Sequence, residues 1–216
     1  MRLVLVSDTH GRHKEIRMPD GDLLIHAGDF SSGRSWHELQ EFADWFYSQP
    51  HRHKVLVAGN HDLLLEDFPA DAQSFFKGYA HYLCDSSIVL EGLKIYGSPW
   101  TPQFFDYAFM LPRGLPLADR WARIPEDTQL LITHGPAQGL ADETFMGEQV
   151  GCEALAERLP QLPDLQLHVF GHIHEGYGYY PPTARRHYAS ANVSNCRWGD
   201  PGLNEPLVLD MEPRTA

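Results

Sequence analysis

The sequence is poor in cysteine and in basic side chains, and each scarcity excludes a class of protein. Its three cysteines, Cys84, Cys152 and Cys196, lie far apart and form no C-x-x-C pair. We therefore expect neither a disulfide framework nor a thiolate metal cluster. A reducing compartment is the simplest expectation for such a chain. The 17 Lys and Arg against 29 Asp and Glu give a formal charge of −12. This charge argues against stable nucleic-acid binding, which needs clustered cations, but a small phosphate-bearing substrate stays possible because bound cations reverse the local sign.

Long apolar runs are also missing. The opening MRLVLVSDTHG is too short for a signal-peptide core, and no later stretch reaches the length of a membrane span. We expect a cytoplasmic protein without a membrane segment. The length of 216 residues predicts one domain over residues 1–216, and nothing in the sequence predicts an oligomeric state.

Short apolar runs that end in polar residues recur along the chain and predict buried strands. They occupy residues 2–8, 22–29, 53–60, 128–135 and 165–172. Residues 86–100 predict a hairpin that turns at Glu91-Gly92. Residues 185–195 and 205–211 add further strands.

Helical patterns lie between these strands. Ser35 with Glu38 is a capping-box signature for a helix that stops at Pro50, and residues 117–125 and 151–163 predict shorter helices. Together, strands and helices predict an α/β layered sandwich of mixed sheets. In α/β sheets, ligands bind outside the carboxyl ends of the strands.

Polar residues suited to metal binding follow five of the predicted strands, in a chain with 13 histidines. In order they are Asp8 with His10, Asp29, Asn60 with His61 and Asp62, His134, and His172 with His174. A glycine accompanies each group, as turns or close backbone approach require. Any one group could be a simple turn former. The ordered set of carboxylate, imidazole and amide oxygen predicts a site for Mn²⁺, Fe, Zn²⁺ or a similar ion.

These motifs resemble those of the calcineurin-like metallophosphoesterase superfamily. The matching segments are Asp8-x-His10, Gly28-Asp29, Gly59-Asn60-His61-Asp62, His134 and Gly171-His172-x-His174. The resemblance implies a four-layer α/β/β/α sandwich of two mixed sheets with a dinuclear metal site. The segments PWTPQFFDYAFMLPRG, THGP, VGCEAL and HVFGHIHEGYG are also similar to the metallophosphoesterase-domain group of cyclic-nucleotide-type phosphodiesterases.

The resemblance also implies a ligand set for each of two divalent ions. One metal would be held by Asp8, His10 and His174, and the other by Asn60, His134 and His172, with Asp29 bridging both. We expect Mn²⁺, with Fe, Zn, Co, Ni or Mg as alternatives. Two ions about 3.5–4 Å apart clamp a phosphate and generate hydroxide at neutral pH. A metal-bridging hydroxide would attack phosphorus in line with the leaving alkoxide.

His61 is expected as a catalytic residue that donates a proton to the leaving oxygen or stabilises its charge. Asp62 would orient His61 and favour its protonated form, unless it is a structural residue of the turn. Asn60 and His61 are expected to touch the bound phosphate as substrate-binding residues.

The leading functional prediction is a metal-dependent phosphodiesterase that acts on small phosphodiesters or nucleotides, with cyclic nucleotides preferred. The first alternative is a phosphomonoesterase or protein phosphatase. Phosphoprotein phosphatases of the superfamily continue Gly-Asp with an acidic residue and an arginine, whereas here Phe30 to Arg34 read FSSGR. This difference disfavours a protein phosphatase and leaves Arg34 either near the site or on the surface.

A non-catalytic binding module is the third reading, because the superfamily's retromer subunit keeps the fold with an impaired site. The complete ligand set, including His172, disfavours it. The Trp100–Arg113 segment leaves two readings open. Its aromatic residues Trp100, Phe104, Phe105 and Phe109 either line a pocket, where they could stack on nucleobases, or cover the core.

Overall fold

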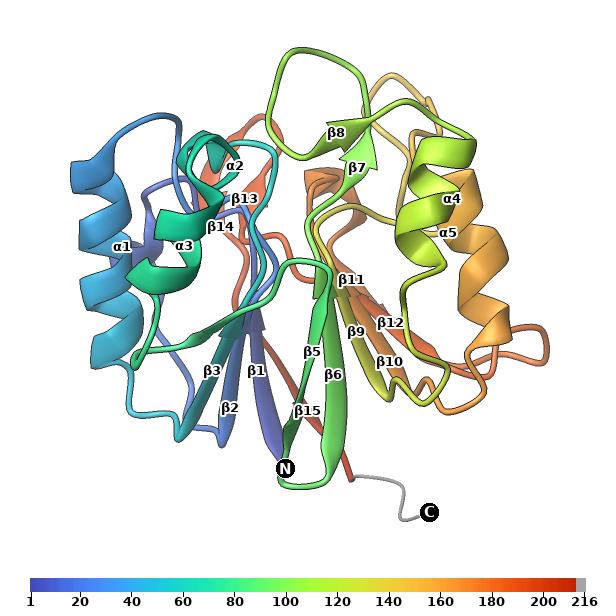
Figure 1. Cartoon of the computed structure of the whole chain (residues 1–216), viewed down its shortest axis with the longest axis horizontal. Coiled ribbons are helices and arrows are strands. Elements are labelled where there is room, and N and C mark those ends of the chain that lie inside the picture. Colours follow the sequence, from blue (N-terminus) through green and yellow to red (C-terminus); the bar gives the residue numbers. More distant parts are fainter. Residues whose placement is uncertain (213–216) are drawn as a thin grey trace.

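Two mixed sheets pack face to face, with helices on both outer sides, in the computed structural model, which describes residues 1–212 (Figure 1). The last four residues of the expected single domain lie outside the described part. The first sheet has five strands in the order β15 (Leu207–Asp210), β1 (Arg2–Val6), β2 (Leu23–His26), β3 (His53–Leu56) and β4 (His81–Tyr82). Strands β1 to β4 run parallel, and β15 pairs antiparallel with β1.

The second sheet has six strands, of which the inner four run parallel. Its order is β11 (Gly178–Tyr180), β12 (Ala189–Asn192), β10 (Leu167–Phe170), β9 (Leu130–Thr133), β6 (Leu93–Ser98) and β5 (Ser86–Leu90). Two short pairs lie outside both sheets: β7 (Thr101–Pro102) with β8 (Met110–Leu111), and β13 (Cys196–Arg197) with β14 (Asp200–Leu203). A parallel bridge between Ser7 and Ser194 joins the two sheets just beyond the carboxyl ends of β1 and β12.

Helices cover the outer face of each sheet (Figure 1). The first sheet is covered by α1 (Trp36–Ser48), α2 (Leu63–Asp67) and α3 (Pro69–Phe75), and the second by α4 (Leu115–Trp121) and α5 (Glu153–Arg158). Short 3-10 turns lie at His13–Glu15, Leu159–Gln161 and His174–Gly176. Within residues 1–212, no helix has the length and apolar character needed to cross a membrane.

Alternation along the strands produces the layers. In β1, Leu3 and Leu5 pack between the sheets, whereas Val4 and Val6 pack toward the helices. Successive side chains of a strand point to opposite faces, so a continuous apolar run serves two cores. The α/β prediction with two mixed sheets in a four-layer sandwich is thus confirmed.

The element boundaries differ from the prediction in informative ways. Each predicted strand forms but ends before its polar residue: β1 stops at Val6, ahead of Asp8, and β9 stops at Thr133, ahead of His134. At the start of α1 the Ser35 side chain accepts from Glu38 N at 3.2 Å, but the Glu38 carboxylate accepts from Ser32 N. Only half of the capping box forms.

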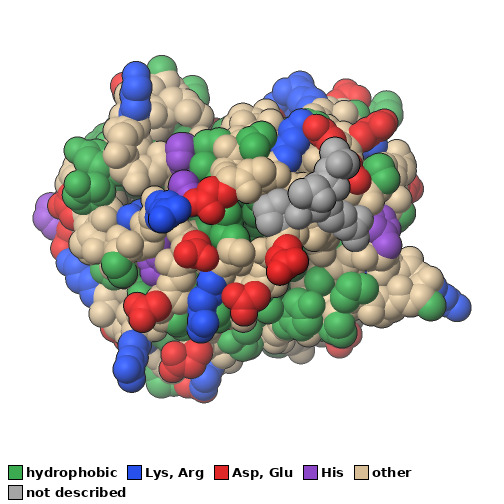
Figure 2. Space-filling model, turned by 90° about the horizontal axis from the view of Figure 1, so that it is seen from below, with side chains coloured by type: hydrophobic (Ala, Val, Ile, Leu, Met, Phe, Trp, Pro, Cys, Tyr) green, Lys and Arg blue, Asp and Glu red, His purple; other side chains and the backbone are tan. Residues whose placement is uncertain are grey.

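The end of the molecule at the amino-terminal edge of the parallel strands faces the viewer in Figure 2. Acidic and basic side chains lie side by side on the described part of this face, without a concentrated basic patch. The loops at the opposite, carboxyl-terminal edge hold the residues described next.

Candidate metal centre

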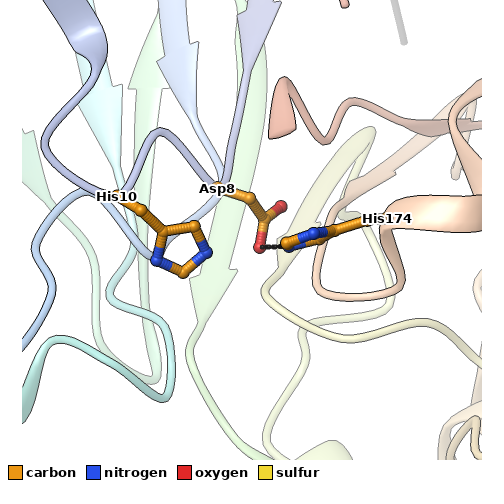
Figure 3. A group of neighbouring side chains, drawn as sticks. All are labelled: Asp8, His10 and His174. Carbon is orange, nitrogen blue, oxygen red and sulfur yellow. Dashed lines mark ion pairs between the residues drawn. The ribbon is translucent and has the colours of Figure 1, made fainter. Parts of the chain in front are cut away.

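The expected ligands converge at the carboxyl-terminal edge of both sheets. The structure contains three overlapping groups of possible ligands, and within each group the ligand atoms lie within 4.8 Å of one another. The groups are Asp8, His10 and His174; His10, Asp29 and His61; and Asp29, His134 and His172. Figure 3 shows the first group, with His10 and His174 on either side of the Asp8 carboxylate. Asn60 joins the cluster through Oδ1, which lies 2.8 Å from His134 Nε2. The structure therefore brings all seven expected ligands together, and their metal binding stays a prediction.

Unusual backbone conformations aim these side chains. Asp8, His10, Asp29 and His172 have φ values of 51°, 43°, 56° and 69°. Such positive φ values are uncommon outside glycine and cluster at functional sites, where surrounding structure holds them. These backbone conformations direct the side chains of the four residues toward the cluster of possible ligands.

Two glycines make room for the carboxylates. A Cβ atom on Gly59 would collide with Asp29 Oδ1, and one on Gly171 would collide with Asp8 Oδ2. Both turns therefore require glycine for close approach of backbone to the site. The predicted role of these two glycines agrees with this geometry.

The two carboxylates at the centre are buried and held by hydrogen bonds. Asp8 accepts from His172 N at 3.1 and 3.0 Å and from Ser194 Oγ at 2.5 Å. Asp29 accepts from His61 N through Oδ1 at 2.7 Å. Burial alone would raise the pKa of both groups, but His174 for Asp8 and His134 for Asp29 bring each pKa below its usual value.

Asp29 Oδ2 is the atom shared by the two halves of the site. It lies 3.8 Å from His10 Nε2 and 3.4 Å from His134 Nε2. His134 Nδ1 lies 2.9 Å from Ala27 O, an arrangement that fixes the ring and directs Nε2 toward Asp29. Burial lowers the pKa of His134, but Asp29 and Asp8 outweigh it and raise the value to about 9.

A divalent cation fits this environment. Within residues 1–212 every ion pair made by Asp8 or Asp29 is with a histidine, and none is with Lys or Arg. Two buried negative charges thus depend on protonated imidazole, and a metal ion at Nε2 would supply the same positive charge. The donor set of carboxylate, imidazole and amide oxygen suits Mn²⁺, Fe or Zn²⁺.

Asp62 accepts hydrogen bonds from the turns that carry expected metal ligands. Its buried carboxylate accepts from Asp29 N at 2.9 Å, Gly59 N at 2.8 Å, and Ser31 N and Oγ at 3.0 and 2.7 Å. Burial and the Asp29 charge raise the pKa of Asp62 to about 7, while these donors favour its charged form. Asp62 thus ties together the turns that carry Asp29 and Asn60, and its expected effect on His61 stays a prediction.

His61 stands at the edge of the cluster. Its ring lies 4.9 Å from that of His10 and 4.7 Å from that of Tyr107, measured between centroids. Burial lowers the pKa of His61, although Asp29 partly opposes this. The ring also belongs to one group of possible ligands with His10 and Asp29, which the sequence did not indicate.

A cleft of about 480 Å³ opens above these residues. It is lined by Asp29, Asn60, His61, His172 and His174 and by aromatic side chains from several loops. Phe104 and Phe105 of the Trp100–Arg113 segment line it and are 49% and 70% exposed, whereas Phe109 is buried. Both readings of this segment therefore hold, each for different residues.

A network around Asp85 stabilises the start of this segment. Trp100 Nε1 donates to Asp85 at 3.0 Å, and the Arg120 guanidinium lies 4.1 Å from the Trp100 ring centroid while also donating to Asp85. Two other rings of the segment lie next to the candidate metal centre. The Phe104 ring lies 5.6 Å from that of His172, and the Tyr107 ring lies 4.7 Å from that of His61, measured between centroids. Arg34 is a surface residue, paired with Asp67 at 2.7 Å.

This chain is similar in sequence to metallophosphoesterases and in fold to a solved structure. The model of the calcineurin-like phosphoesterase family matches residues 1–176. Human "Metallophosphoesterase domain-containing protein 1" is 40% identical over 233 residues, 97% of this chain and 71% of the human protein. UPF0046 protein C25E10.12 of Caenorhabditis elegans is 33% identical over 98% of this chain and 81% of its own. The crystal structure of TT1561 from Thermus thermophilus shares the fold, with a TM-score of 0.64 at 12% identity over 88% of each chain.

Proposed function

The chain belongs to the calcineurin-like phosphoesterase family, and on that premise we propose that it is a metal-dependent phosphodiesterase acting on small phosphodiesters, cyclic nucleotides foremost. The observation that carries the proposal is the complete cluster around Asp29, whose Oδ2 lies between His10 and His134. A non-catalytic relative would have no need of a full ligand set in strained turns.

Two divalent ions, Mn²⁺ in our proposal, would occupy the cluster. Asp8, His10 and His174 would hold one and Asn60, His134 and His172 the other, with Asp29 between them. Bound there, the ions would act as Lewis acids on the phosphoryl oxygens and lower the pKa of coordinated water. The protein's part is to keep the donors deprotonated, oriented and close together.

His61 would serve the leaving group. Its ring lies at the edge of the cluster and lines the cleft, where it can protonate the departing alkoxide oxygen and become neutral imidazole. Burial favours the neutral ring in the free protein, and the negative charge of a bound phosphodiester would favour the protonated form needed for donation. The Asn60 amide, which lines the same cleft as His61, would contact a phosphoryl oxygen.

The charges around the cleft support a diester over a monoester. Arg34 points to the surface, and Arg113 in the cleft wall is already paired with Glu153. Among the described residues that line the cleft, Arg113 is thus the only Lys or Arg, and a diester, with its single negative charge, needs less cationic support than a dianionic monoester. We also propose that the reaction takes place in the cytoplasm, since the three cysteines are free thiols.

Hydrolysis of bis(p-nitrophenyl) phosphate by the purified protein tests the proposal. With Mn²⁺ we expect turnover of this diester at a higher kcat/KM than that of p-nitrophenyl phosphate. Chelation by EDTA should abolish it. His61→Ala should lower kcat by about 10²–10⁴-fold, the usual contribution of a general acid, for a diester with an alkoxide leaving group such as adenosine 2′,3′-cyclic phosphate, and by less for bis(p-nitrophenyl) phosphate, whose nitrophenolate leaves without a proton. A preference for the monoester would favour a phosphomonoesterase, and no turnover with Mn²⁺, Fe²⁺, Zn²⁺ or Mg²⁺ would refute an enzymatic role.

A further inference from the structure

An exposed pair of stacked rings lies in the cleft beside the candidate metal centre. The centroids of Phe145 and Trp198 are 4.6 Å apart with 12° between the ring planes. The residues are 60% and 58% exposed, and both line the cleft that Asn60 and His172 also line. Exposed apolar surface of this kind in a ligand cleft usually marks a binding site.

Both rings come from segments that are fastened next to candidate ligands. Phe145 N donates at 2.8 Å to Oε1 of Glu175, the residue after one of the site histidines. Trp198 lies in the turn between β13 and β14, and Arg12 donates at 2.7 Å to the carbonyl oxygen of Pro201 in β14. Arg12 follows another site histidine by two positions. The pair is therefore held at a set place relative to the metal centre.

The charges of the cleft limit what can reach these rings. Glu148 and Glu175 add negative charge to its lining, and the Arg113 guanidinium is taken up by Glu153 and by the carbonyl oxygen of Val150. This surface disfavours a polyanion such as an oligonucleotide or a nucleoside triphosphate. It accommodates a ligand with one phosphate group and an uncharged flat portion.

We propose that Phe145 and Trp198 form a stacking subsite for the planar aromatic group of the substrate, a nucleobase or a similar ring. The subsite is separate from Phe104 and Tyr107, whose rings contact His172 and His61 at the reaction centre. The inference rests on the proposed function in placing the phosphate at the metal centre. Stacking of one base is worth about 1–3 kcal/mol, or roughly 5- to 150-fold in affinity.

Isothermal titration calorimetry on the Mn²⁺-loaded protein tests the subsite without requiring turnover. Adenosine 5′-monophosphate and ribose 5-phosphate share the phosphate and the sugar and differ only in the base. We expect the first to bind at least about fivefold more tightly to the wild-type protein. Trp198→Ala and Phe145→Ala should each reduce this ratio to below twofold, and Trp198→Phe should restore most of it. Trp36→Ala, which removes a 43% exposed ring outside the cleft, is the matched control.

Equal affinities of the two ligands in the wild-type protein, or an unchanged ratio in both alanine variants, would overturn the subsite. A ratio lost equally in Trp36→Ala would also overturn it, because the effect would then not be local. Absence of diester hydrolysis in the same preparation would refute the proposed function instead. The two proposals can thus fail separately.

Discussion

His172 is the side chain at which a single substitution separates the two halves of the candidate metal centre. Its imidazole belongs to the group with Asp29 and His134, while its backbone N–H donates to both oxygens of Asp8 in the other group. A substitution of the side chain leaves the backbone contact in place. The positive φ of 69° makes glycine the replacement that the local backbone accepts with least strain.

We therefore expect His172→Gly to keep the fold and the Asp8 group but to lose one metal position. Bound Mn²⁺ should fall from two ions per chain to about one, and diesterase kcat/KM should fall by more than about 10²-fold, since even loss of an outer-shell partner costs about 10- to 100-fold. Metal content by mass spectrometry, circular dichroism and the bis(p-nitrophenyl) phosphate assay measure these effects. His37→Ala, at a side chain that is 85% exposed, should change none of them. Two bound metals with full activity in His172→Gly would show that the assignment is wrong.

At the scale of strands and turns, the turn after β10 is tightly constrained. A Cβ at Gly171 would collide with Asp8 Oδ2 and would also come within 2.8 Å of Ser7 Cβ. The collision involves a carboxylate that His172 N, Ser194 and His174 already fix. Asp8 therefore cannot give way without leaving the site.

Gly171→Ala should displace Asp8 and with it one metal, at a cost of about 1–3 kcal/mol in unfolding free energy, as for an overpacked core position. Gly33→Ala provides the control, because nothing lies within 4 Å of the added methyl group. Urea denaturation and metal content of the two variants give the comparison. Similar metal affinity in both variants would contradict the steric argument.

Much of this arrangement could be predicted from the sequence, because its signals are local or ordered along the chain. Apolar runs predicted the strands, and the order of Asp, His and Asn after them predicted which residues meet. The pairing of Asp62 with Ser31 and Gly59 could not be predicted, since a turn residue can direct its carboxylate toward several neighbours. Phe145 and Trp198 were missed because they lie in separate loops without any periodic signal.

At the scale of the whole chain, histidines that are buried away from the metal centre make the unfolding free energy depend on pH. His168 is buried beside Phe170, and its Nε2 lies 2.7 Å from Thr133 Oγ1, which itself donates to Gly135 O. Thr133 therefore accepts from the Nε2–H group of His168, while burial of the ring favours its neutral form. Burial, with a smaller contribution from Arg186, lowers the pKa of His168 to about 3.

The sign of the effect follows from the two protonation states. Between the unfolded pKa of about 6.5 and the folded pKa of about 3, the unfolded chain binds one more proton at His168 than the folded chain does. The contribution of His168 to the unfolding free energy should thus be constant above a pH of about 6.5. It should fall by about 1.4 kcal/mol per pH unit as the pH decreases below that value. His26, with its pKa lowered to about 3 by burial, adds a similar slope.

Substitution of His168 isolates its share of this acid sensitivity. His168→Gln keeps an N–H donor for Thr133 but cannot titrate, so its unfolding free energy should fall less steeply between about pH 6 and pH 4.5, by about 1.4 kcal/mol per pH unit. Urea denaturation of both proteins over that interval gives the difference of slopes, in which the contributions of the metal centre and of His26 cancel. His37→Gln, at an exposed helical position, should retain the wild-type slope. Equal slopes for His168→Gln and the wild-type protein would mean that His168 becomes protonated in the folded state, and that this buried ring does not contribute to acid unfolding.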